Sequence, residues 1–250
     1  MYPSSSRSRR PFAALALLPV IAALAFAGCS NDNNAIINPG GGGGSSTYDG
    51  TIAGPTTSGT LTVTIATSTP APQPGPARSA GTVTATGTLV LSGGGGTIAL
   101  TGTHDDVAHA LTIAGSGWSF TGGTTGFGME GTYAGPGGVS GVFSIQRNGT
   151  GTDTVVVVVG TYAATVGTGS GNFNISIRGT AIHGNAFDYT GGTAIPLDGT
   201  FTVGTGAISI VNAGNPGGPP LATGTLTGAS ATGTWDNSAG DSGTWSGTKQ

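Results

Sequence analysis

Short segments in which apolar and polar residues alternate follow one another from about residue 47 to the end of the chain. The clearest are Leu61, Val63 and Ile65, set between threonines, and Phe173, Ile175 and Ile177, set between Asn172, Asn174, Ser176 and Arg178. Residues two apart share one face of a strand, so this alternation predicts strands with one apolar face and one face in water. The valine run 155–159 instead predicts a strand covered on both faces or closely packed at its centre. Beyond the N-terminal segment, no stretch shows a helical period.

A three-residue motif, Gly-Thr followed by an apolar residue, recurs along the same part of the chain. Examples are Gly59-Thr60-Leu61, Gly131-Thr132-Tyr133, Gly160-Thr161-Tyr162, Gly233-Thr234-Trp235 and Gly243-Thr244-Trp245. Its spacing is irregular, which favours a meander over a solenoid of fixed period. Threonine suits the wet face of a strand, because it is β-branched and carries a hydroxyl group.

The pattern predicts an all-β, antiparallel, Gly/Thr-rich fold, either an up-and-down barrel or a barrel-like sandwich. About a dozen strands of 6 to 9 residues can be identified in residues 47–250. They would form one large barrel, or a smaller barrel preceded by an N-terminal sheet. The Pro-rich segment 69–78 is the best candidate for an internal break, and 216–220 is predicted to be a second loop.

The composition supports this fold and excludes several classes of protein. Glycine makes up 50 of the 250 residues and charged residues only 7%, which argues against helices. The glycines have no three-residue period, so the chain is not collagen. Once the basic N-terminus is set aside, four cations, Arg78, Arg147, Arg178 and Lys249, face ten acidic residues. A net charge of −6 without a basic cluster excludes nucleic acid as a partner.

The first 30 residues carry the most specific motif of the chain. A basic segment, 1–10, precedes an apolar run, 11–27, and Ala27-Gly28 then lead into Cys29, the single cysteine. The arrangement is typical of a secretory signal and not of a spanning helix, since a polar Asn/Gly stretch follows. Phe26-Ala27-Gly28-Cys29 resembles the lipobox of bacterial lipoproteins. The resemblance implies removal of residues 1–28 and attachment of acyl chains to Cys29, which would anchor the chain in a membrane.

The residue after the cysteine indicates the expected location, and the segment that follows is predicted to be a tether. Ser30 replaces the aspartate that commonly retains lipoproteins of this kind in the inner membrane, so we expect the outer membrane, on either its periplasmic or its outer side. Ser8-Arg9-Arg10-Pro11-Phe12 resembles the twin-arginine motif, which leaves both that route and general secretion open. Residues 29–46 are predicted to be a flexible tether spanning roughly 20 to 25 Å.

Two motifs contain residue types that could bind a metal or a cofactor, but both have simpler structural explanations. His104, Asp105, Asp106 and His109 are residue types that bind divalent metals, but they fall at a predicted hairpin, with His109 expected to point inward. Residues 126–131 match G-x-G-x-x-G, yet no helix is predicted after them, so no dinucleotide or other cofactor is expected.

The aromatic residues of the strands would either fill the barrel or line a cavity in it; they are Trp118, Phe120, Phe127, Phe143, Phe173, Trp235 and Trp245. The chain has no G-x-S-x-G motif and only three histidines, so we do not expect an enzyme. We expect a lipid-anchored interaction or structural module that contacts an envelope protein or a glycan. The alternative is a lipocalin-like barrel that binds a small hydrophobic ligand. Cys29 is the one residue to which the sequence assigns a functional role.

Overall fold

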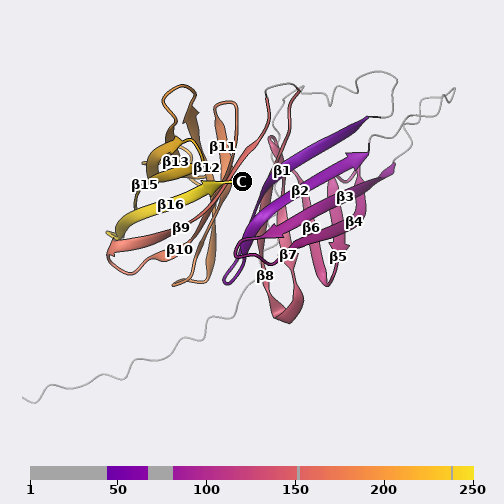
Figure 1. Ribbon diagram of the computed structural model, residues 1–250, viewed down its shortest axis with the longest axis horizontal. Helices are drawn as coiled ribbons and strands as arrows, with labels where there is room; N and C mark the ends of the chain where they lie inside the picture. The colour runs from indigo at the N-terminus through magenta and orange to yellow at the C-terminus, as the bar shows by residue number, and fades with distance from the viewer. Residues whose placement is uncertain (1–43, 67–80, 151–152, 238) are drawn as a thin grey trace, which may run out of the picture. The chain divides into compact units, whose positions relative to one another are not determined.

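The strands of the chain form two groups of eight (Figure 1). The computed structural model describes residues 44–66, 81–150, 153–237 and 239–250. The first group comprises β1 Ser45–Ala53, β2 Ser58–Ala66, β3 Thr82–Leu91, β4 Thr97–Asp105, β5 Ala110–Gly115, β6 Trp118–Thr124, β7 Gly128–Ala134 and β8 Ser140–Arg147. The second comprises β9 Val156–Val166, β10 Ser170–Arg178, β11 Ala181–Asp188, β12 Thr193–Thr202, β13 Ala207–Asn212, β14 Ala222–Thr227, β15 Ser230–Asp236 and β16 Ser242–Lys249.

The all-β prediction is confirmed. In the part of the chain that the structure describes, the only helical element is a single 3₁₀ turn, Pro136–Gly138. None of the helical structure in those residues could cross a lipid bilayer.

Each group closes into an up-and-down antiparallel barrel. Successive strands pair in order, β8 returns to pair with β1, and β16 returns to pair with β9. The expectation of one large barrel, or of one barrel with a preceding sheet, was wrong. The Pro-rich segment 69–78 falls outside the described residues, but β2 and β3 on either side of it pair directly. The change from one barrel to the next comes instead between β8 and β9.

The two barrels are related by an internal repeat that the irregular spacing of the short motif obscured. Residues 131–147, which form β7 and β8, align without a gap with 233–249, which form β15 and β16. The identical pairs are Gly131/Gly233, Thr132/Thr234, Gly138/Gly240, Ser140/Ser242, Gly141/Gly243 and Ser144/Ser246. Strand pairing follows the same register, since Gly131 faces Phe143 and Gly233 faces Trp245.

An aromatic ring lies over two facing glycines inside each barrel. Phe143 packs over the cross-strand pair Gly122 and Gly131, and a Cβ added to Gly131 would lie 2.7 Å from that ring. Trp245 packs over the corresponding pair Gly224 and Gly233, where an added Cβ on Gly233 would lie 2.6 Å from the indole Nε1. The interior has room for the ring only because both glycines lack side chains.

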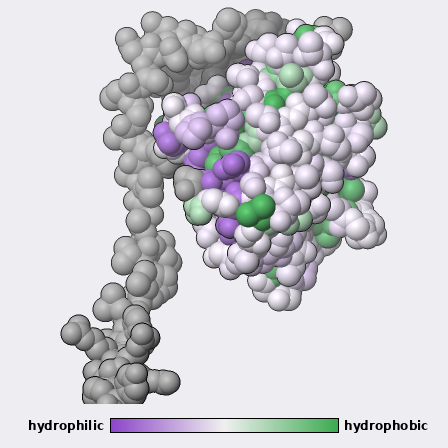
Figure 2. All heavy atoms as spheres, turned by 90° about the vertical axis from the view of Figure 1, so that its left-hand side faces the viewer, coloured by the Kyte–Doolittle hydropathy of each residue, from purple (hydrophilic) through white to green (hydrophobic). Residues whose placement is uncertain are grey.

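The inner faces are apolar and the outer faces carry mainly threonine, as the alternation predicted. Phe120, Met129 and Ile145 are among the buried residues of the first barrel, and Ile175 and Ile210 are among those of the second. Figure 2, drawn from the side on which β13 and β15 lie in Figure 1, is mostly pale, as expected of a surface rich in threonine, serine and glycine. This distribution is the reverse of that in a transmembrane barrel, whose outer face is apolar.

One predicted wet face is instead buried between the barrels. On β10, Asn172, Asn174 and Ser176 face outward from their own barrel but are at most 1% exposed. The Asn172 Nδ2 donates to the carbonyl of Gly54 at 2.9 Å, and the Asn174 Nδ2 donates to that of Ile52 at 2.8 Å. The alternation gave the direction of these side chains correctly, but a second barrel takes the place of the water.

Three further groups hold this contact. The Gln146 Nε2 of β8 donates to the carbonyl of Ser176 at 2.7 Å. Val157 and Val159 are buried on the outer side of β9 while Val158 is buried on its inner side, so the prediction that the valine run is covered on both faces is confirmed. Arg178, at the end of β10, pairs with Asp153 of the segment between the barrels at 2.7 Å.

The glycine pair under Trp245 leads to a stability prediction. Gly233→Ala is expected to lower the free energy of unfolding by about 1 to 3 kcal/mol, because its methyl group would overlap the indole in a closed interior. Chemical denaturation measures the effect. The control is Gly126→Ala, since a Cβ on Gly126 would meet nothing within 4 Å. Equal stability of the two variants would contradict the packing argument.

Candidate functional site

A pocket of about 160 Å³ opens at one end of the second barrel. The turns β9–β10, β11–β12 and β15–β16 and the loop before β14 surround it. Its walls include the aromatic residues Tyr162, Phe173 and Trp235, the acidic residues Asp188, Asp236 and Asp241, and Leu221. The loop before β14 contains residues 216–220, whose prediction as a loop is confirmed. The mouth of a barrel is a common place for a small-molecule site.

Two aromatic rings meet at a steep angle in this mouth pocket. Tyr162 and Trp235 lie with ring centroids 5.2 Å apart and planes at 78°. The Trp235 indole crosses toward the β9–β10 turn, where its Nε1 donates to the carbonyl of Ala163 at 3.2 Å and its ring lies against Gly169. Deeper in the barrel, Phe173 stacks on Trp245 at 4.7 Å. The pocket therefore has rigid aromatic walls above an aromatic floor.

The three carboxylates of the pocket have different roles. Asp188 accepts backbone hydrogen bonds from Thr190 at 2.9 Å and Gly191 at 3.0 Å, which holds the β11–β12 turn. Asp241 accepts a hydrogen bond from the Asn237 Nδ2 at 3.2 Å within the β15–β16 turn. Among the described residues, the Asp236 carboxylate has no hydrogen-bond partner. That carboxylate is exposed and free to contact a ligand.

The electrostatics of the pocket are negative. Burial raises the pKa of the Tyr162 hydroxyl, and the neighbouring Asp188 carboxylate raises it further. Tyr162 therefore stays neutral at physiological pH, and it can donate a hydrogen bond without adding charge.

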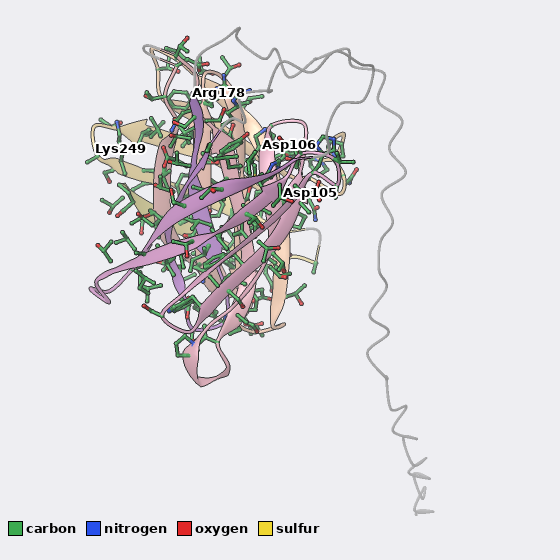
Figure 3. All side chains as sticks on the ribbon, turned by 90° about the vertical axis from the view of Figure 1, so that its right-hand side faces the viewer. Asp105, Asp106, Arg178 and Lys249 are labelled. Carbon is green, nitrogen blue, oxygen red and sulfur yellow. The ribbon has the colours of Figure 1, made fainter. Side chains whose placement is uncertain are left out.

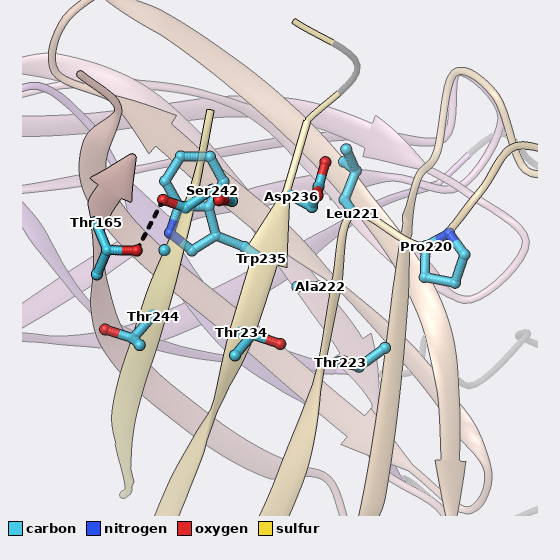
Figure 4. Close-up of a pocket in the computed structure, with 11 residues that line it drawn as sticks. Thr165, Pro220, Leu221, Ala222, Thr223, Thr234, Trp235, Asp236, Ser242 and Thr244 are labelled. Atoms are coloured by element: carbon cyan, nitrogen blue, oxygen red, sulfur yellow. Dashed lines mark hydrogen bonds between the residues drawn. The ribbon is translucent and has the colours of Figure 1, made fainter. Parts of the chain in front are cut away.

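A second, more open depression of about 320 Å³ lies beside the first and shares Leu221, Trp235 and Asp236 with it. Figure 4 shows Trp235 and Asp236 together at this end of the strands, with Thr234 and Thr244 along its floor. The Thr165 hydroxyl donates to the carbonyl of Ser242 at 3.3 Å and ties β9 to β16 at the edge of the depression. Trp235 is thus the aromatic residue that lines both hollows.

The first barrel is filled where the second has its pocket. Phe120 corresponds to Ala222 in the repeat, and its ring packs on Phe143 and Tyr133 at 5.8 and 5.7 Å. Trp118, which corresponds to Pro220, lies 5.8 Å from Tyr133. Both smaller residues, Pro220 and Ala222, line the open depression, so the second copy is less filled directly beside the mouth pocket. Single-sequence reasoning missed the pocket because the repeat that carries this comparison went unrecognised.

The His104 cluster spans the end of β4 and the turn that follows it: His104 is buried in the strand, and the turn predicted at 104–106 lies at 106–109. The Asp105 carboxylate accepts the backbone N–H groups of Val107 and Ala108, each at 2.8 Å, and these bonds lower its pKa. His104 Nδ1 lies 3.0 Å from Asp106 Oδ1. The prediction that His109 points inward was wrong, because it is exposed in the turn with a φ of 53°.

No metal centre is present in the described part of the chain: nowhere in it do three or more His, Cys, Asp or Glu residues come close enough to hold an ion. Figure 3 shows Asp105 and Asp106 side by side, apart from Arg178 and Lys249. The G-x-G-x-x-G match, 126–131, lies in the β6–β7 turn and the start of β7, with no helix after it.

A small polar cluster lies between the barrels. Phe127, which the sequence assigned to a barrel interior, instead stacks on His183 of β11 with centroids 3.6 Å apart. His183 Nδ1 lies 2.7 Å from Asp198 Oδ1. Burial raises the pKa of Glu130 on β7, and the Asp198 carboxylate raises it further. This cluster holds the two barrels together.

The other sequence-predicted residues are placed as follows. Trp118, Phe120, Phe143, Phe173 and Trp245 are buried in the barrel interiors, while Trp235 lies at the mouth pocket. Cys29, the predicted signal segment 1–28 and the predicted tether up to residue 43 lie outside the described residues, whereas Ser45 and Ser46, also assigned to the tether, begin β1. No protein-family model, curated protein or solved structure matches the chain.

The raised pKa of Glu130 makes the contact between the two barrels depend on pH. The folded protein holds this proton more tightly than the unfolded chain does, so the contribution of Glu130 to stability is present at acidic pH and is lost as pH rises through the folded-state pKa. Glu130→Gln is expected to raise the melting temperature at about pH 8 and to change it little at about pH 4. Thermal melts at both pH values test this, and the same difference at both would refute it.

Proposed function

We propose that this chain is a lipid-anchored protein of the bacterial outer membrane that binds a small ligand in the mouth pocket and catalyses no reaction. The observation that carries the proposal is the contrast within the repeat. Aromatic side chains fill the first barrel, whereas the second has an opening walled by Tyr162 and Trp235. A duplicated unit that replaces large core residues by smaller ones loses packing energy, and a binding site gives that loss a function.

The chemistry of the pocket supports binding and not catalysis. Its described lining contains no histidine, cysteine or lysine, the residue types that most often act as bases or nucleophiles. Asp188 and Asp241 already hold turns of the backbone. The tether would carry this barrel clear of the lipid surface, with its mouth accessible from the surrounding solution.

A second function, contact with an envelope protein or a glycan, is favoured by the outer surface of the first barrel. Five exposed threonines occupy successive cross-strand positions from β3 to β7, and they are Thr84, Thr103, Thr112, Thr121 and Thr132. Neighbouring strands lie about 4.8 Å apart, so the hydroxyl groups form a regular row. An uncharged row of donors and acceptors suits a polar partner with its own repeat, such as a glycan chain.

The ligand proposal is tested by native mass spectrometry of the full-length protein, released gently from the envelope of the producing cell. We expect a bound mass in the wild type and its loss in Trp235→Ala, because that variant removes one pocket wall. Val203→Ala, an exposed change at the opposite end of the same barrel, is the control and should keep the mass. Melting curves show whether Trp235→Ala remains folded. Bare protein in every preparation would contradict the proposal.

The anchor has a separate test. Cys29→Ser is expected to move the protein from the membrane fraction to the soluble fraction, because acyl chains need the thiol as their point of attachment. Detergent phase partitioning of cell extracts measures the change, with Ser30→Ala as the control that should remain in the membrane. A Cys29→Ser variant that still partitions with membranes would refute lipid anchoring.

A further inference from the structure

Charge is separated along the second barrel. Asp188, Asp236 and Asp241 lie at the mouth pocket, whereas Arg178 and Lys249 lie at the far ends of β10 and β16. Asp188 pairs with Gly171 of β10, seven residues from Arg178, which separates these two positions by about 23 Å along the strand. This exceeds the screening length of about 8 Å at physiological salt, so the two cations do not neutralise the mouth. A positively charged ligand is favoured there.

The aromatic walls of the mouth pocket also favour a positively charged ligand. Tyr162 and Trp235 pack in a T-shaped arrangement at 78°, and both rings line the same small volume. A cation over the face of tryptophan or tyrosine is attracted by the ring quadrupole, and alkylated ammonium groups are bound in this way because they are weakly hydrated. Phe173 adds an apolar wall for the carbon atoms of such a group.

The size of the pocket limits the ligand. Its volume of about 160 Å³ is below the roughly 300 to 1,000 Å³ of sites that enclose a drug-sized molecule. The mouth pocket therefore accommodates a head group and leaves the remainder of a larger ligand outside, along the open depression beside Trp235.

The first barrel provides an internal comparison. In the repeat, Asp236 and Asp241 correspond to Ala134 and Val139, and Tyr162 corresponds to Ile52. Only the second copy combines carboxylates with aromatic walls, so neither closure of the barrel nor its shared motif requires them.

We propose that the mouth pocket binds the alkylated ammonium head group of an organic cation, with Tyr162 and Trp235 against its methyl groups and Asp236 as its counter-ion. This inference rests on the proposed function and specifies its ligand. The positive charge replaces the expectation of a purely hydrophobic ligand.

Isothermal titration of the full-length protein with two probes of the same shape tests the charge. Choline carries the quaternary ammonium group, and 3,3-dimethylbutan-1-ol has carbon in place of nitrogen and is neutral. We expect choline to bind at least about tenfold more tightly than the alcohol. Equal binding of the two probes would overturn the inference and leave a neutral-ligand pocket. Absence of choline binding in the millimolar range would also overturn it.

Variants locate the contacts. Asp236→Asn keeps the shape of the side chain and removes its charge. It should weaken choline binding about tenfold without changing the affinity for the alcohol. Asp106→Asn, in the first barrel, is the matched control and should leave both affinities unchanged. Loss of choline affinity in both variants would indicate general charge attraction and overturn the site.

The two proposals fail differently. If native mass spectrometry finds a neutral ligand and choline does not bind, the charge of the ligand is wrong and the binding function stands. If choline shows no binding and the protein purified from its own envelope carries no ligand, both fail.

Discussion

The space inside an eight-stranded barrel is the constraint on which the rest of this structure depends. A closed barrel of this size has an interior just wide enough for side chains, so each large ring must be offset by small residues near it. Phe143 and Trp245 meet this requirement by lying over facing glycine pairs. The constraint explains the Gly-Thr-apolar motif: in Gly233-Thr234-Trp235 the glycine leaves room inside, the threonine faces out and the aromatic residue points back in.

The same constraint decides where one copy can differ from the other. Once Gly122 and Gly131 fix the place of a central ring, the residues nearer the mouth decide whether the barrel is filled. Phe120 fills the first barrel, whereas its counterpart in the second is the smaller Ala222, beside the opening at which Trp235 lies. Loss of a buried ring ordinarily costs about 3 to 5 kcal/mol, so the second barrel depends more on other contacts for its stability.

The sequence predicted the parts of this structure that depend on local patterns. Alternation gave the class of fold and the inward positions such as Leu61 and Ile175, and turn chemistry gave the role of Asp105. The number of barrels was missed because closure depends on the pairing of β1 with β8 and of β9 with β16, between residues far apart in the chain. Periodicity gives the direction of a side chain and not what it meets, which is why Asn174 was expected in water. The mouth pocket depends on differences in size between equivalent residues, and it is visible only once the copies are aligned.

The contact between the barrels offsets the packing energy that is lost in the interior of the second barrel. Val157 and Val159 provide apolar burial there, and Asn172 and Asn174 each donate to a backbone carbonyl of the first barrel. Such bonds are directional, and a buried donor left unpaired costs about 1 to 3 kcal/mol, so the barrels are favoured in the register in which both asparagine Nδ2 groups donate. β10 is the strand that joins these functions. Its outer asparagines hold the first barrel, and its inner Phe173 forms part of the pocket. The filled barrel thus supports the open one through a strand that also lines the site.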